Sequence, residues 1–143
     1  MSLRESHFLE KFLYPKSVAI VGASRNAFRP NHYLVANLVK LGFAGEIYPV
    51  NPEAGEILGL KTFPDLKSIE GPVDLAVVAV PHHLTLRLLQ DCAAKGIKRV
   101  TIVAGGFSET GDEGKKVQRE MAALLRQNGV RAIGPNALGP INA

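Results

Sequence analysis

The residues best suited to bind a ligand form a short loop of small and polar side chains. The loop follows an apolar run at residues 18–21 and precedes a helical pattern; it contains Gly22, Ala23, Ser24, Arg25, Asn26 and Ala27. Strand, tight loop and helix in this order build phosphate sites in parallel α/β sheets, because unpaired backbone N–H groups bind the anion and small side chains let it approach. The loop therefore predicts a phosphate-bearing ligand, with a tight turn that binds nothing as the alternative.

The loop is a variant of the dinucleotide-binding fingerprint. Gly22 occupies the first glycine position, whereas Ser24 and Ala27 replace the second and third glycines. The other expected strands also end in small, polar or kinked residues, namely Asn51-Pro52, Pro81-His82, Ala104-Gly105-Gly106 and Gly134-Pro135-Asn136. Ligands of open α/β sheets lie across the carboxyl ends of the strands, near the point where the strand order reverses. These strand ends favour a nucleotide-like ligand.

The residue after the second strand distinguishes between nucleotides. A dehydrogenase that binds NAD has Asp or Glu there, which binds the ribose hydroxyls. This chain has the neutral Asn51, which favours a ribose that carries a phosphate. An NADP enzyme would have an arginine directly after the strand, where this chain has Pro52 and Glu53. Arg25 and Arg29 flank the first loop and either pair with phosphates or remain solvated.

Strands and helices alternate along the chain and position these loops. Six strands are expected, at residues 18–21, 46–50, 61–63, 74–80, 99–103 and 130–133. The continuous apolar run at residues 74–80 is typical of a strand buried on both faces of a parallel sheet. Right-handed crossovers then predict an α/β fold: a doubly wound, mostly parallel, six-stranded Rossmann-like sheet with helices on both faces. We expect a single domain at residues 1–143, with a helical lead-in at residues 1–14.

Composition excludes several classes of protein. The chain has 143 residues, of which 46% are hydrophobic, enough for the core of one domain. Its net charge of +4 is dispersed, which does not favour a nucleic-acid partner. The sequence has no unbroken apolar run of about 18 residues, so it predicts no membrane span. Its first residues do not have the charged-then-apolar pattern of a secretory signal. The single cysteine, Cys92, is expected to be a buried hydrophobe in a cytoplasmic protein.

Five motifs stand in the order typical of one family. They are PKSVAIVGAS (15–24), IYPVNP (47–52), VDLAVVAVP (73–81), GFSETG (106–111) and GPNALG (134–139). They resemble the N-terminal coenzyme A (CoA)-binding domain of the NDP-forming acyl-CoA synthetases, which are relatives of the succinyl-CoA synthetase α-subunit. The same domain opens some protein acetyltransferases. The resemblance covers about residues 8–142.

The resemblance implies that the chain binds CoA, in which an adenosine 3′-phosphate is joined through a pyrophosphate to pantetheine. In the family, the loop after the first strand holds the phosphates, the exit of the penultimate strand contacts CoA, and the last loop lies near the thiol. The expected CoA-binding residues are Gly22, Ala23, Ser24, Arg25, Asn26, Ala27, Asn51, Pro52, Val80, Pro81, Val103, Ala104, Gly105 and Asn136. No catalytic residue and no metal ligand is expected.

The sequence departs from the family pattern at two places. The succinyl-CoA synthetase branch has a lysine shortly after the second strand, where this chain has Glu53 and Ala54. The same branch has a cysteine in the last loop, where Ala137 stands here. The first departure leaves that side of the expected site without the basic residue of the succinyl-CoA synthetase branch.

The family's reaction passes a phosphoryl group through a histidine in the next domain, and an ATP-grasp domain binds the nucleotide. This chain ends at Ala143, just past the expected first domain, and its histidines (His7, His32, His82 and His83) match no phosphohistidine motif. A solvated or helix-capping side chain explains His82 as well as a catalytic one. The chain alone is therefore expected to bind CoA without turnover, as part of an acid–thiol ligase completed by further domains or a partner subunit.

Two other functions remain open. One is a stand-alone CoA-binding or redox-sensing module without catalysis. The other is a small NAD(P)-binding domain, which Asn51 and Ser24 disfavour. The acyl substrate and the choice between ATP and GTP depend on residues outside this chain.

Overall fold

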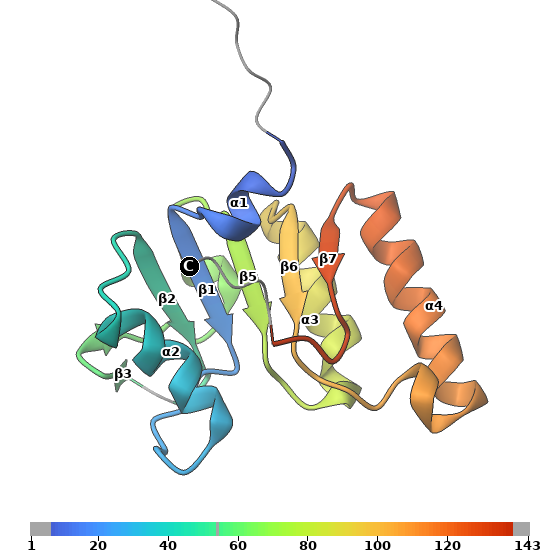
Figure 1. Ribbon diagram of the computed structural model, residues 1–143, viewed down its shortest axis with the longest axis horizontal. Helices are drawn as coiled ribbons and strands as arrows, with labels where there is room; N and C mark the ends of the chain where they lie inside the picture. The colour runs from blue at the N-terminus through green and yellow to red at the C-terminus, as the bar shows by residue number, and fades with distance from the viewer. Residues whose placement is uncertain (1–6, 54, 139–143) are drawn as a thin grey trace, which may run out of the picture.

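A five-stranded parallel sheet is the centre of the fold (Figure 1). The computed structural model describes residues 7–53 and 55–138. The strand order is β2-β1-β5-β6-β7. The bounds are β1 (Ser17–Val21), β2 (Glu46–Val50), β5 (Leu75–Val78), β6 (Arg99–Ile102) and β7 (Arg131–Ile133).

The apolar runs form these strands because both faces of the sheet are covered. All five residues of β1 are buried, and β5 is buried at three of its four residues. Val18 and Ile20 pack on one side of the sheet, and Ala19 and Val21 pack on the other. A strand without polar alternation fits this environment.

Helices cover the two faces separately (Figure 1). On one face lie α1 (Glu10–Leu13) and α2 (Pro30–Lys40), whose Phe12 and Val35 join the core with Val18. On the other face lie η1 (Leu66–Ser68), α3 (His82–Lys95) and α4 (Asp112–Gln127), with Leu89 and Met121 in the core. The short η2 (Ser108–Thr110) joins β6 to α4. The predicted Rossmann-like α/β fold with helices on both faces is confirmed.

The predicted sixth strand of this sheet, at residues 61–63, is wrong. Lys61 belongs instead to a two-stranded antiparallel hairpin of β3 (Glu56–Ile57) and β4 (Leu60–Lys61). Phe63 makes only an isolated parallel bridge to Val50, in which its N–H donates to the Pro49 carbonyl and its carbonyl accepts from Asn51. Pro64 follows at once and has no N–H to continue the ladder. The main sheet therefore has five strands.

Parts of three predictions lie outside the described residues. They are residues 1–6 of the expected lead-in, Ala54 after the second strand, and residues 139–143, which include the end of the last motif. Among the described helices, none is both long and apolar enough to cross a membrane.

Candidate functional site

The strand order reverses between β1 and β5, and this places a crevice at their carboxyl ends. The chain leaves β1 toward α2 on one face and leaves β5 toward α3 on the other face (Figure 1). Gly22 sits at the crevice with a φ of 93°, and a Cβ at this position would lie 2.4 Å from the carbonyl oxygen of Ala79. Only glycine fits this contact between the two loops.

The loop after β1 leaves part of its backbone free to bind an anion. The N–H groups of Gly22 and Ala23 both donate to the Val50 carbonyl. Within the described part of the chain, the N–H groups of Ser24, Arg25 and Ala27 make no hydrogen bond. Successive backbone N–H groups that point to the same side of a loop form an anion-binding concavity.

Ser24 and Asn26 shape this loop from within. Asn26 N–H donates to Ser24 Oγ at 3.1 Å, and Asn26 Oδ1 accepts from Phe28 N–H at 2.9 Å. The Ser24 hydroxyl acts here as an acceptor, so its own proton is free to donate to a ligand. Arg25 and Arg29 are exposed at the same loop, and neither makes an ion pair with another described residue.

Two asparagine amides hold the loop in place. Asn51 Nδ2 donates to the Ala23 carbonyl at 2.7 Å, and Asn51 Oδ1 accepts from Glu53 N–H at 2.8 Å. Asn31, in the first turn of α2, donates to the carbonyls of Gly22 at 2.9 Å and Ala79 at 2.7 Å. Both Asn31 bonds are tertiary contacts, and Asn31 is not among the site residues that the sequence predicts. The sequence signal for Asn31 is its position directly after Pro30, in the first turn of the helix that follows the fingerprint loop.

A pocket of about 310 Å³ lies beside this loop, at the ends of β1, β2 and β5. We call it the strand-end pocket. Its apolar walls are Pro52, Pro64, Leu66, Val80, Leu84 and Leu88. Gly22, Pro52 and Val80 are predicted site residues that line it, whereas its α3 wall was not foreseen. Its volume is at the lower end of the range of about 300–1,000 Å³ usual for ligand pockets.

The exit of β6 forms a second group of predicted residues. Val103 N–H donates to the Val78 carbonyl at 3.0 Å, and Asn136 N–H donates to the Ala104 carbonyl at 2.9 Å. The Asn136 amide lies 3.4 Å from the position of a Cβ built on Gly105. Ala104, Gly105 and Asn136 are therefore adjacent. The predicted residues thus form two groups, one around Gly22 and one around Gly105. Pro81 lies between the two groups, because it follows β5 as the N-cap of α3 and β5 lies between β1 and β6.

The backbone of the β6 exit is already capped by a carboxylate. Glu109 accepts from Gly106 N–H at 2.5 Å and from Phe107 N–H at 3.1 Å. Hydrogen bonds from the backbone N–H of Gly106 and from its own N–H hold the pKa of Glu109 below its usual range. His82 is exposed and its ring packs edge-on against Phe107.

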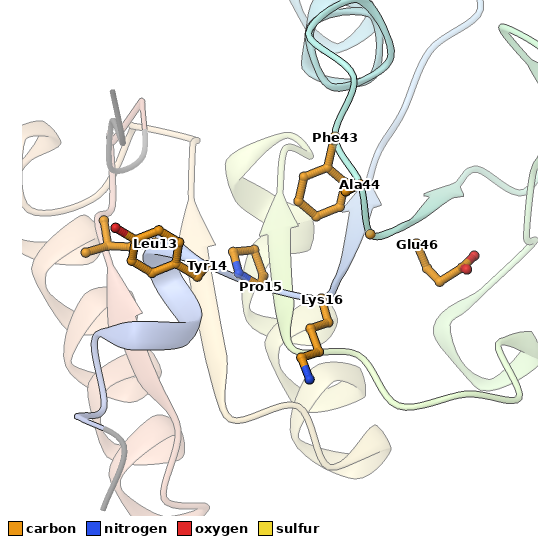
Figure 2. Close-up of a pocket in the computed structure, with 8 residues that line it drawn as sticks. Leu13, Tyr14, Pro15, Lys16, Phe43, Ala44 and Glu46 are labelled. Carbon is orange, nitrogen blue, oxygen red and sulfur yellow. The ribbon is translucent and has the colours of Figure 1, made fainter. Parts of the chain in front are cut away.

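A larger hollow, of about 560 Å³, lies at the opposite edge of the sheet (Figure 2). It is lined by the start of β1 and β2, including Tyr14, Lys16, Phe43 and Glu46. In Figure 2, Lys16 and Glu46 extend in different directions and do not converge on a common point. A ligand site needs convergent polar groups, so the carboxyl edge is the candidate site.

Comparisons with known proteins show the family of the chain. Residues 16–143 match the family model of a CoA binding domain. The chain is 44% identical over 134 residues to the ADP-forming acetate–CoA ligase II of Archaeoglobus fulgidus, covering 94% of this chain and 20% of that protein. It is 39% identical over 137 residues to the α-subunit of ADP-forming acetate–CoA ligase I of Pyrococcus furiosus, covering 93% of this chain and 30% of that subunit.

Solved structures share the fold. The apo dinucleotide-forming acetyl-CoA synthetase 1 of Ca. Korarchaeum cryptofilum superposes with a TM-score of 0.87 at 34% identity, covering 92% of this chain and 28% of that one. A conserved hypothetical protein of Pyrococcus furiosus gives a TM-score of 0.65 at 26% identity, covering 82% of this chain and 90% of that one. The chain thus spans less than a third of the ligases it matches. By its motifs, its fold and its sequence similarity, the chain belongs to the family of CoA-binding domains found in ADP-forming acyl-CoA ligases.

Proposed function

We propose that this chain binds CoA across the carboxyl edge of the sheet, as the CoA-binding domain of an NDP-forming acyl-CoA synthetase. Such an enzyme makes an acyl-CoA from an acid and CoA with ATP or GTP. One observation carries the proposal: in a chain of the CoA-binding family, the loop after β1 has N–H groups on Ser24, Arg25 and Ala27 that are unpaired within the described residues.

The pyrophosphate is assigned to this loop. Three backbone N–H groups and the Ser24 hydroxyl are donors for its oxygens, and Arg25 and Arg29 add positive charge. Charge-assisted hydrogen bonds of this kind are roughly twice as strong as neutral ones. Gly22, Ala23 and Asn26 contribute by keeping the loop open.

We assign the remaining predicted residues to parts of CoA by the position of their strands in the order β2-β1-β5-β6-β7. Asn51 and Pro52 lie at the end of β2 and belong to the nucleoside side of the ligand. Val103, Ala104, Gly105 and Asn136 lie at the ends of β6 and β7 and belong to the pantetheine side. Val80 and Pro81 follow β5, between the two groups.

The chain supplies binding, and other parts of the ligase supply the reaction. No group of three His, Cys, Asp or Glu side chains among the described residues is arranged to hold a metal ion. We propose that further domains or a partner subunit carry the phosphohistidine and the nucleotide-binding site. A ligase that uses cellular ATP and CoA is expected in the cytoplasm.

A stand-alone CoA-binding module is the second candidate. It is supported by the Pyrococcus furiosus hypothetical protein, 90% of whose length this fold covers. A reading frame that continues beyond Ala143, or a neighbouring gene for a nucleotide-binding subunit, favours the ligase. With ATP, Mg²⁺, acetate and CoA, the chain alone is expected to form no acetyl-CoA and no phosphohistidine under either candidate.

Calorimetry with CoA and NAD tests the proposal. CoA is expected to bind and NAD is not. Ser24→Ala is expected to weaken CoA binding about tenfold, the value of one hydrogen bond to a charged group. Ser24→Glu is expected to weaken it more than about a hundredfold, because a carboxylate then faces the phosphates. Gln127→Glu, which adds the same charge at the end of α4, is the control and should bind like the parent. NAD binding without CoA binding contradicts the proposal.

A further inference from the structure

Among the described residues, the strand-end pocket has one basic side chain, and it lies on the α3 wall, which is not part of the predicted site. Arg87 is in the second turn of α3, between Leu84 and Leu88, which form part of the apolar lining. Positions three and four apart share one side of a helix. Leu84, Arg87 and Leu88 therefore face the pocket together.

Neither acidic residue that the structure describes at the pocket forms an ion pair with Arg87. Asp65 Oδ1 accepts from the backbone N–H and the hydroxyl of Ser68, both at 2.8 Å, and this capping of η1 commits the carboxylate. Asp91 lies one helical turn beyond Arg87, farther along α3. Among the described residues, Arg87 makes no ion pair or side-chain hydrogen bond. Its guanidinium is exposed and free to bind an anion at the pocket rim.

The apolar lining suits a purine ring. Pro52, Pro64, Leu84 and Leu88 present flat or branched apolar surface, and Gly22 lines the same pocket. A base in this pocket would therefore be directly adjacent to a pyrophosphate bound at the loop after β1. This order of subsites matches the order of groups in CoA: adenine, ribose with its 3′-phosphate, and pyrophosphate.

We infer that Arg87 binds the 3′-phosphate of CoA when the adenosine of CoA occupies this pocket. CoA has two separate anionic groups, and arginines lie at two separate places beside the candidate site, in the loop after β1 and in α3. Arg25 and Arg29 belong to the loop after β1 and do not line the pocket, whereas Arg87 does. A guanidinium forms paired hydrogen bonds with phosphate oxygens. Arg87 is thus a specificity-determining residue for CoA over nucleotides that lack the 3′-phosphate; the inference rests on the proposed function.

Paired titrations with CoA and 3′-dephospho-CoA test this assignment. The parent chain is expected to bind CoA about tenfold or more tightly than dephospho-CoA, the effect of hydrogen bonds to a charged group. Arg87→Gln should bind CoA about as weakly as dephospho-CoA, while its affinity for dephospho-CoA stays unchanged. The unchanged affinity also shows that the variant is folded. Arg126→Gln, at the far end of α4, is the matched control and should keep the full preference.

Asp91 gives a second, smaller test. It follows Arg87 by four residues, a spacing at which opposite charges attract. Asp91→Asn removes this competitor and is expected to tighten CoA binding about twofold, with no change for dephospho-CoA. A loss of CoA affinity in Asp91→Asn would contradict the inference.

The outcomes separate the inference from the proposed function. If neither ligand binds the parent chain, the proposed function fails. If both bind equally well, or if Arg87→Gln keeps the preference for CoA or weakens both ligands alike, CoA binding stands and the role of Arg87 is refuted. A preference lost in Arg25→Gln or Arg29→Gln but kept in Arg87→Gln would move the 3′-phosphate to the loop after β1.

Discussion

The loops after β1 and β6 both contain glycine and both lie at the carboxyl edge of the sheet. They differ in whether their backbone N–H groups already have a hydrogen-bond partner. Within the described residues, the N–H groups of Ser24, Arg25 and Ala27 are unpaired. Those of Gly106 and Phe107 are bound by the Glu109 carboxylate. The second loop already contains the anion that its geometry favours, whereas the first has room for one from outside. A glycine-rich strand exit is therefore a phosphate site only if no side chain of its own occupies it.

The two loops also differ in what holds them. Side chains from other elements hold the first loop: Asn51 at the end of β2 and Asn31 in α2 bind its carbonyls. Glu109, two or three residues away in sequence, holds the second. The side chains of Ser24 and Asn26 also bond within the first loop, but among the described residues they leave the N–H groups of Ser24, Arg25 and Ala27 free.

The largest effect is expected from adding a side chain at the close contact between the loops after β1 and β5. Gly22→Ala places a Cβ 2.4 Å from the Ala79 carbonyl oxygen at a φ of 93°. It is expected to lower the free energy of unfolding by about 2–4 kcal/mol and to weaken CoA binding. Gly42→Ala is the control, because Gly42 has a φ of 69° but no atom within 4 Å of its Cβ position. That variant should cost only about 1 kcal/mol. Equal losses in urea unfolding would show that the contact between the loops is unimportant.

An intermediate effect is expected at Asn31. Asn31→Ala leaves the carbonyls of Gly22 and Ala79 without this donor, at a cost of about 1–3 kcal/mol. It should also reduce CoA affinity, because the loop after β1 is then less ordered before binding. Asn37→Ala, on the exposed side of the same helix, should change neither quantity appreciably. If Asn31→Ala behaves like Asn37→Ala, the loop after β1 is held by something else.

The smallest effect is expected at Glu109, and it depends on pH. Glu109→Gln removes the charge that binds Gly106 and Phe107, so its melting temperature should fall below that of the parent at neutral pH. The Glu109 pKa is lowered from 4.5 in the folded state. Its stabilisation is therefore fully present above the unfolded-state pKa and is lost as the pH falls through the folded-state pKa. The difference should shrink below about pH 4.5. Glu120→Gln, on the exposed face of α4, is the control for the loss of a carboxylate charge and should keep the parent's melting temperature at neutral pH.

Much of the fold could be predicted from the sequence because local signals agreed with it. The apolar run before Gly22 and the run at residues 74–80 both became buried parallel strands. After the connection through Gly55 and Gly59, the sequence predicts a short edge strand of the main sheet at residues 61–63. Pro64 limits its pairing there to one bridge at Phe63, and a run that short does not reveal its partner.

The site was predictable where it depends on the backbone and less so where it depends on tertiary contacts. The fingerprint pattern indicated the loop after β1. The sequence did not show that Asn31 reaches two carbonyls, or that Arg87 lies beside Leu84 and Leu88 in a pocket at the end of β2. Both depend on where a helix sits relative to the sheet. The helical spacing of Leu84 and Leu88 indicated a common face, but not what that face would meet.

The most direct test is a titration of the ¹⁵N-labelled chain with CoA, followed by amide chemical shifts. The account predicts large, saturable shifts for the N–H groups of Ser24, Arg25 and Ala27, and small ones for Gly106 and Phe107, whose N–H groups remain bound to Glu109. Large shifts at Gly106 and Phe107, with Ser24, Arg25 and Ala27 unchanged, would place the phosphates at the wrong loop and contradict the account.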